Sequence, residues 1–194
     1  LLARVESPTL VAPGEIVTED QLPANYRWTL SSELTAQIGE VARSRDTTVA
    51  SLMQFAWAVL LSRLTGERTV VFGETVSGRP ADLDGVESIV GLLINTVPTV
   101  VDVDPSSTVV EVLDAMRADK VATLDYQHLG LAELTAMSGH DTLFDTLTVY
   151  ESYPVDTQSL STVDSTAVGG LQIVDAQVQD ATHYPLVLAT APSG

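Results

Sequence analysis

The sequence predicts an α/β fold in which helices pack against a mixed β-sheet. Segments whose apolar residues recur at helical spacing alternate with short runs rich in β-branched residues, and this alternation is typical of layered α/β folds. The chain has 194 residues and 45% of them are hydrophobic, so it can bury a sizeable core within one domain or one large lobe. We find no internal repeat.

The start of the chain predicts no regular element. Residues 1–25 contain three prolines and a glycine without any sustained period, so we expect an extended inter-lobe or linker segment there. Residues 26–194 are then expected to form one lobe. The opening residues include no initiator methionine and no basic signal region, and we interpret the chain as a piece of something longer.

The next stretch predicts one strand and two helices. Tyr26–Leu30 is expected to be the first strand. Ser31 and the residues after it suit a helix N-cap, and apolar spacing then predicts an amphipathic helix to about Arg45. Residues 49–64 are apolar on nearly all sides, which predicts a central core helix that ends at Gly66 in a left-handed conformation.

Two strands and a loop follow these helices. We expect a mostly buried strand over Thr69–Thr75 and a loop over residues 76–86. From Leu92 to Val103 the residue types alternate, which indicates a strand with two different faces. Pro98 lies inside this strand and cannot donate a ladder hydrogen bond, so the strand is expected at a sheet edge or with a bulge.

The last third predicts two more helices and three strands. Pro105-Ser106-Ser107 suits the start of a helix that runs from about Thr108 to Asp125, and a short helix is expected over Leu131–Met137. The strands are expected over residues 143–151, 170–178 and 184–190, with a Ser-, Thr- and Asp-rich connection at 156–168.

Composition excludes several classes of protein. The formal charge is −17 with only nine Lys and Arg, which excludes nucleic acid as a partner because phosphate binding needs basic residues. The chain has no cysteine, which excludes disulfides, thiolate catalysis and zinc-thiolate sites. The longest apolar segment, Val49–Leu61, is shorter than the roughly 20 residues of a membrane span, so no membrane partner is expected. Nothing indicates secretion, and we expect a cytoplasmic protein.

Two stretches contain residues that core packing alone does not explain. Asn95 and Thr96 interrupt a run of Leu, Ile and Val, and a buried amide without a partner costs about 1–3 kcal/mol. Ser77-Gly78-Arg79 marks a tight turn at the end of the strand before it. Loops at strand ends often form functional sites.

The remaining chemistry of the sequence is sparse. It contains no motif of a nucleophile elbow, a phosphate-binding loop or a zinc helix, so we assign no catalytic residue. His128, His140 and His183 are far apart in sequence, and we interpret each as structural. His140 with Asp141 and Asp145 resembles a solvated turn more than a metal site, so we assign no metal.

Five motifs follow one another in order and cover most of the chain. They are Phe72-Gly73-Glu74-Thr75-Val76-Ser77-Gly78-Arg79-Pro80, Val90-Gly91-Leu92-Leu93-Ile94-Asn95-Thr96, Tyr126-Gln127-His128-Leu129-Gly130-Leu131, Leu143-Phe144-Asp145-Thr146-Leu147 and Thr182-His183-Tyr184-Pro185-Leu186. Together they resemble the C-terminal half of the condensation domains of non-ribosomal peptide synthetases, and their order and spacing make the resemblance specific.

The resemblance implies a fold and a reaction. Family members have two lobes that resemble chloramphenicol acetyltransferase, arranged in a V with a channel between them. An upstream carrier protein presents an acyl or peptidyl thioester, and a downstream carrier presents the aminoacyl thioester that attacks it. The arms of both carriers are phosphopantetheine, and an adenylation domain adjoins. Such peptide bond formation serves antibiotic biosynthesis and other secondary metabolism.

The family's catalytic signature is absent from this sequence. It consists of two adjacent histidines followed after three residues by Asp-Gly and lies in the N-terminal half of the domain, whereas no His-His occurs here. The resemblance therefore implies the C-terminal, acceptor-side lobe alone, with the N-terminal lobe as its partner. We expect no cofactor bound by this chain and no activity from the isolated chain.

The resemblance also implies which residues line the channel. Asn95 and Thr96 brace a strand at the lobe junction or contact substrate. Ser77 faces the acceptor, while Arg79 ties down its loop or meets a phosphopantetheine phosphate. Two other functions stay open: a lobe of an epimerisation domain, which inverts an α-carbon, and a non-catalytic relative that recruits partner enzymes. The expected channel residues are Ser77, Gly78, Arg79, Asn95, Thr96, Tyr150 and Glu151.

Overall fold

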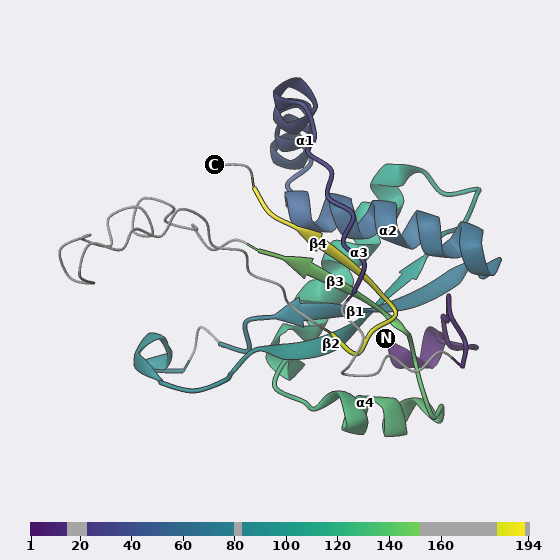
Figure 1. The fold of residues 1–194 in the computed structure, drawn as a ribbon, viewed down its shortest axis with the longest axis vertical. Coiled ribbons are helices and arrows are strands. Elements are labelled where there is room, and N and C mark those ends of the chain that lie inside the picture. The colour runs from purple at the N-terminus through teal and green to yellow at the C-terminus, as the bar shows by residue number, and fades with distance from the viewer. Residues whose placement is uncertain (15–22, 80–82, 152–181, 193–194) are drawn as a thin grey trace.

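The computed structural model describes residues 1–14, 23–79, 83–151 and 182–192. Within these ranges a four-stranded sheet, in the order β2-β1-β3-β4, forms the centre of the fold (Figure 1). Its strands are β1 (Thr69–Val76), β2 (Asn95–Asp102), β3 (Thr146–Tyr150) and β4 (Leu186–Thr190). The helices are α1 (Ser32–Ser44), α2 (Val49–Thr65), α3 (Val109–Thr123) and α4 (Leu131–Ser138), with 3-10 turns η1 (Leu2–Arg4), η2 (Val86–Ser88) and η3 (Leu124–Tyr126).

The sheet is mixed, as the sequence predicts. β1 pairs antiparallel with β2 over its whole length, from Thr69 opposite Asp102 to Val76 opposite Asn95. β3 runs parallel to β1, and β4 runs parallel to β3. β2 is the strand at one edge of the sheet, so the prediction that Pro98 marks an edge strand is confirmed.

Helices cover both faces of this sheet. On one face, α2 and α3 pack on a cluster centred on Leu61, Phe72 and Val101. On the other face, α4 and the N-terminal segment pack on a cluster that includes Val71 and Phe144. Alternate residues of a strand therefore pack into the hydrophobic clusters on opposite faces of the sheet. This pattern is expected of a sheet that is buried on both sides.

The helix ends follow from local chemistry. Ser31 and Thr48 cap α1 and α2 through their side-chain oxygens, and Gly66 ends α2 with φ +80°, all as the sequence predicts. The cap of α3 differs from the expected Pro105-Ser106-Ser107, because Thr108 caps the helix in a capping box with Glu111. The hydrogen bonds from Thr108 hold the pKa of the Glu111 carboxyl below its ordinary value.

Two sequence predictions about element type and burial are corrected by the structure. Tyr26–Leu30 is not a strand: no described segment pairs with it, and Trp28 is 79% exposed. A strand needs a neighbour to satisfy its backbone, and sequence pattern alone cannot supply one. Helix α2 is apolar on nearly all sides but buries only one of them, since Leu60 and Leu64 are exposed.

Several strand boundaries are also shorter than predicted. β2 begins at Asn95 rather than Leu92, because residues 92–94 lie in the loop after β1, and β3 and β4 are trimmed to five residues each. The expected strand at 170–178 and the connection at 156–168 lie outside the described residues.

The N-terminal residues pack against the sheet. Thr9 is fully buried, forms a parallel bridge with Phe144 and accepts a 2.8 Å hydrogen bond from the Val71 N–H. The carboxylate of Asp145 accepts from the N–H groups of Val11 and Ala12, at 2.9 and 2.8 Å. Residues 1–14 are therefore held in place by the core of the fold.

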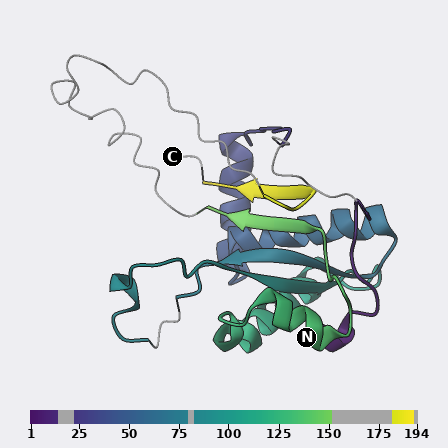
Figure 2. The ribbon, with the colours of Figure 1, turned by 60° about the horizontal axis from the view of Figure 1, so that its bottom comes forward.

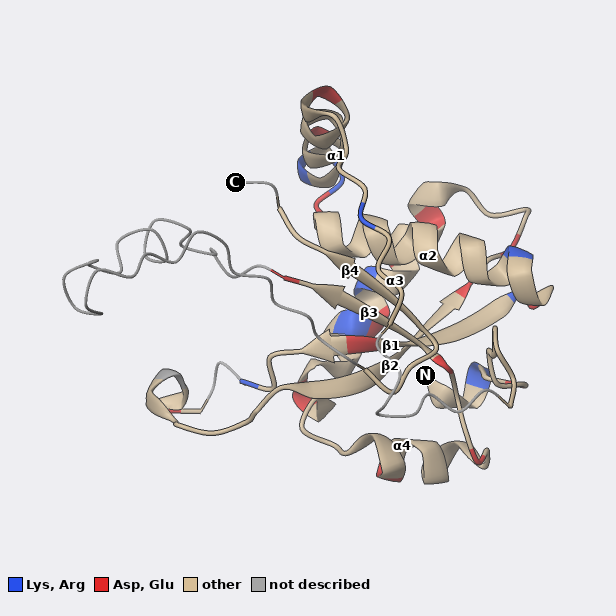
Figure 3. Cartoon of the chain, in the orientation of Figure 1, with Lys and Arg blue, Asp and Glu red and all other residues tan. Residues whose placement is uncertain are grey.

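The distribution of charged residues and the lengths of the helices bear on which partners the surface can bind. Acidic and basic residues occur together on α1 and α3, whereas β3 and β4 carry no charged residue (Figure 3). No single helix among the described residues is both long and apolar enough to cross a membrane. Only α1 and α2 taken together reach that length and composition, and the chain bends by 103° between them.

Candidate functional site

One end of the sheet gathers the residues that the sequence predicts as a channel wall. β1, β3 and β4 are parallel, so their carboxyl ends share this end, and the antiparallel β2 begins there. The loop after β1, which carries η2, extends away from the sheet at the same end (Figures 1 and 2). Ligands of open α/β sheets bind outside the carboxyl ends of strands.

The turn after β1 depends on Gly78. Its φ is +61°, and a Cβ added there would lie 1.8 Å from the carbonyl oxygen of Leu93. Only glycine tolerates both the left-handed backbone and this approach. The turn therefore brings the end of β1 against the loop that leads into β2, and it leaves the Ser77 side chain exposed.

Arg79 ties this loop together. Its guanidinium donates to the carbonyl oxygen of Val86 and, at 3.4 and 3.5 Å, to that of Ile89. These are carbonyls at the start and just beyond the end of η2. Of the two roles that the sequence leaves open for Arg79, the contacts favour the loop anchor over a phosphate contact.

Asn95 joins the sheet to the connection between α3 and α4. Its Nδ2 donates to the carbonyl oxygens of Gln127 and Leu129, both at 2.8 Å, and its Oδ1 accepts from the Thr96 N–H at 2.9 Å. α3 and α4 cover opposite faces, so this connection passes around the edge strand β2 where Asn95 holds it. The amide in the apolar run is thus fully used by backbone groups.

The Thr96 side chain lies on the opposite face of the sheet from that of Asn95. Its side chain lies beside the bare Cα of Gly73 and meets the hydroxyl of Tyr184. Tyr184 in turn stacks on Phe144, with ring centroids 5.9 Å apart. Burial raises the pKa of Tyr184 above its ordinary value, and the contact with Thr96 offsets part of that rise.

Tyr150 and Glu151 end the next strand. By the register of β1 with β3, Tyr150 lies level with Val76. The Glu151 N–H donates to the Thr190 carbonyl oxygen at 2.8 Å, and Glu151 is exposed at this end of the sheet. The structure thus brings the two motifs of β1 and β2 into direct contact and places Tyr150 and Glu151 one strand away.

Comparison with known proteins identifies the family. A sequence model of the condensation domain matches residues 10–194. This chain belongs to the condensation domain family. Chondramide synthase of Chondromyces crocatus is 37% identical over 190 residues, which are 96% of this chain and 5% of that protein. Vanchrobactin synthetase of Vibrio anguillarum is 36% identical over 182 residues, 94% of this chain and 6% of that protein.

A solved structure agrees on the fold. The first condensation domain of the CDA synthetase superposes with a TM-score of 0.55 at 21% identity, covering 62% of this chain and 28% of that one. The predicted α/β class, a lobe like those of chloramphenicol acetyltransferase with helices on a mixed sheet, is confirmed. The chain spans a few per cent of the length of these relatives and under a third of that solved structure.

The three histidines of this chain have separate local surroundings. His128 is exposed, between the two carbonyl groups that Asn95 binds. The Nε2 of His140 lies 3.2 Å from the Val5 carbonyl oxygen, so this ring holds the N-terminal segment. His183 lies against the ring of Tyr184, with centroids 4.2 Å apart. Among the described residues no group of His, Asp and Glu side chains could hold a metal ion.

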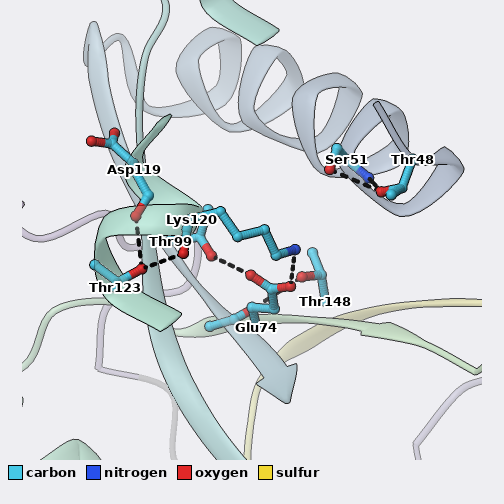
Figure 4. Close-up of polar contacts among 9 residues, drawn as sticks. Thr48, Ser51, Glu74, Thr99, Asp119, Lys120, Thr123 and Thr148 are labelled. Atoms are coloured by element: carbon cyan, nitrogen blue, oxygen red, sulfur yellow. Dashed lines mark hydrogen bonds and ion pairs between the residues drawn. The ribbon is translucent and has the colours of Figure 1, made fainter. Parts of the chain in front are cut away.

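Sequence reasoning missed one polar group near the site. Glu74, inside the buried strand β1, forms an ion pair with Lys120 of α3 at 2.6 Å and accepts from the Thr99 hydroxyl at 3.0 Å (Figure 4). The signal was present in the sequence, because a carboxylate in a buried apolar strand needs partners as much as the amide of Asn95 does.

Proposed function

We propose that this chain is the acceptor-side, C-terminal lobe of a non-ribosomal peptide synthetase condensation domain. The observation that carries the proposal is the meeting of the Ser77-Gly78-Arg79 turn with the start of β2 at one end of the sheet. The family match supports it. We assign Ser77, Gly78, Arg79, Asn95, Thr96, Tyr150 and Glu151 to the lobe's side of the channel.

The reaction would join two carrier-bound substrates. The amine of the downstream aminoacyl thioester attacks the carbonyl carbon of the upstream acyl or peptidyl thioester. A C–N bond forms, the C–S bond breaks, the thiol of the upstream phosphopantetheine arm leaves, and the amine loses a proton. The product is a peptide one unit longer on the downstream carrier.

The lobe would contribute to the reaction by forming a wall of the substrate channel, and it would not transfer a proton. Gly78 and Arg79 fix the loop, and Asn95 fixes the connection around β2, so the channel wall is rigid before substrate enters. The imidazole that orients the amine would come from an N-terminal lobe that carries the His-His signature. Both carriers, that lobe and an adjoining adenylation domain would be the partners, and the reaction would take place in the cytoplasm.

A chimera tests this proposal. The aligned part of the first condensation domain of the CDA synthetase is replaced by this chain, and carriers loaded with donor and acceptor are analysed by intact-protein mass spectrometry. We expect the extended peptide on the downstream carrier. We expect none from this chain alone, and none when the first histidine of the other lobe's His pair is changed to alanine.

Other outcomes would favour the alternatives. Exchange of an acceptor α-hydrogen with solvent deuterium without a new amide bond would indicate an epimerisation lobe. A folded chimera that binds both carriers but yields no product, while the unaltered domain does, would indicate a non-catalytic relative. Product from the isolated chain would contradict the division of labour between lobes.

A further inference from the structure

A small pocket lies beside the candidate site, lined by residues of α2, α3, β1 and β2 and by Leu1. Its volume is about 40 Å³. Each of these elements contributes a hydrogen-bonding side chain: Gln54 from α2, Lys120 from α3, Glu74 from β1 and Thr99 from β2. Polar side chains from four elements converge on one cavity, although core packing would favour apolar ones.

The geometry of the pocket is set by Glu74. One of its carboxylate oxygens binds the Lys120 ammonium at 2.6 Å, and the other accepts from Thr99 at 3.0 Å, as the dashed lines of Figure 4 show. Thr148 of β3 lies next to this carboxylate and donates to the Gly73 carbonyl oxygen at 3.1 Å. The carboxylate is therefore held in one orientation from two sides.

Gln54 is the member of the pocket without such contacts. Its side chain lines the cavity, the residue is only 6% exposed, and its amide makes no hydrogen bond to another described residue. A buried amide of this kind is normally satisfied. The Gln54 amide is therefore placed to bond with a group that enters the pocket.

The charges that face the pocket cancel. Glu74 is neutralised by Lys120, and Asp119, which also lines the pocket, is paired with Arg4. A charged ligand would gain no net attraction and would lose its hydration. The lining offers both donors and acceptors, so it suits a neutral hydrogen-bonding group.

The pocket lies next to residues that contact or neighbour the candidate site residues. Val97 and Gln127 line it, and Gln127 is a residue whose carbonyl oxygen Asn95 binds. By strand alternation, Asn95, Val97 and Thr99 face the same side of β2. Glu74 lies on β1, the strand that pairs with β2, and Ser77 follows three residues later, just after the end of β1.

We propose that this pocket receives the end of the acceptor's side chain and selects a small neutral hydrogen-bonding group, a hydroxyl or a carboxamide. Roughly 10–15 Å³ of such space holds one water molecule, so the cavity admits a group of two or three heavy atoms. The inference rests on the proposed function, because the acceptor must be carried to this end of the sheet.

Isosteric acceptors test the pocket. The active chimera is given threonyl and valyl thioesters, then asparaginyl and leucyl thioesters, on the same downstream carrier, and kcat/KM is measured for each. We expect threonine over valine and asparagine over leucine, each by about tenfold or more, because a site built around polar groups rejects an isostere that cannot bond to them.

Two variants test whether the pocket causes the preference for polar over apolar acceptors. Glu74→Met with Lys120→Met removes both partners of the ion pair at similar volume, and Gln54→Leu removes the amide alone. We expect the double variant to bring both ratios near one and Gln54→Leu to lower them severalfold. Asp114→Ala with Arg117→Ala, which removes an exposed ion pair of α3, is the control and leaves the ratios unchanged.

The outcomes separate the inference from the proposed function. If the unaltered chimera forms peptide with all four acceptors at similar kcat/KM, the proposed function stands and the pocket holds only ordered water. Ratios that persist in both the double variant and Gln54→Leu would place the selection elsewhere and overturn the inference. If no acceptor yields peptide although the parent domain does, both the proposed function and the inference fail.

Discussion

The Cα of Gly78 faces the carbonyl oxygen of Leu93 so closely that a side chain on it would need the space of that oxygen, at 1.8 Å from the new Cβ. Leu93 belongs to the loop that leads into β2, and Gly78 to the turn that leaves β1. This contact locks together the two motifs that the sequence singles out.

Gly78→Ala should therefore disrupt the turn. The left-handed φ alone costs about 1–2 kcal/mol for alanine, and the collision with backbone adds to it. Thermal and urea unfolding should show a larger loss than for Gly139→Ala, where φ is +78° but no atom lies within 4 Å of the new Cβ. Equal losses at the two sites would show that the loop moves away from the new side chain.

Asn95→Asp should destabilise the connection around β2. The change removes two donated hydrogen bonds and places a carboxylate against the carbonyl oxygens of Gln127 and Leu129, so we expect a loss of about 2–4 kcal/mol. Hydrogen exchange should speed up at the Leu129 N–H, which donates to the Tyr126 carbonyl oxygen. Gln37→Glu, an amide-to-acid change on the exposed side of α1, is the matched control for charge.

Local patterns predicted the helices well. The caps of α1 and α2 and the left-handed Gly66 depend on residues within one turn of the chain, and the sequence contains all of them. Tyr26–Leu30 has an equally clear alternating pattern, yet it is not a strand. Whether an alternating segment joins a sheet depends on a partner distant in sequence, and local pattern does not encode that partner.

The site residues likewise divide into features that local sequence predicts and contacts that depend on residues distant in sequence. Asn95 was recognisable as a residue that needs hydrogen bonds, and the structure supplies Gln127 and Leu129, which no spacing rule would have paired with it. The pair of Glu74 and Lys120 joins a strand to a helix 46 residues later. Such a pair becomes visible only when the antiparallel register and the packing of α3 are known.

Tyr184 should make stability depend on alkaline pH. Burial raises its pKa in the folded protein, whereas in the unfolded chain it ionises near its ordinary value of about 10. Its contribution to stability is therefore complete below about pH 10 and is lost as pH rises through the folded pKa. The difference in unfolding free energy between wild type and Tyr184→Phe should be constant up to about pH 9 and fall above about pH 10. A difference that stays flat to pH 11 would contradict the burial of this hydroxyl.

Asp145→Asn should release the N-terminal segment. The carboxylate accepts from both Val11 and Ala12, and an amide would turn an N–H group toward one of these donors. We expect a loss of about 2 kcal/mol, since hydrogen bonds to a charged acceptor are stronger than neutral ones. Hydrogen exchange at the Val11 and Ala12 amides should speed up most. Asp141→Asn, on an exposed residue nearby, should leave both amides unchanged.

Arg79→Lys separates the two roles that the sequence left open for this residue. Lysine keeps the charge but lacks the planar fork that reaches the carbonyl oxygens of Val86 and Ile89 together. If Arg79 anchors the loop, hydrogen exchange at the Ser88 and Ile89 amides should increase, and stability should fall by about 1 kcal/mol. Arg117→Lys on the surface of α3 is the control and should change neither. If Arg79 instead binds the phosphate of a carrier's arm, Arg79→Lys would leave those amides protected while KM for the loaded carrier rises, and the loop-anchor assignment would have to be withdrawn.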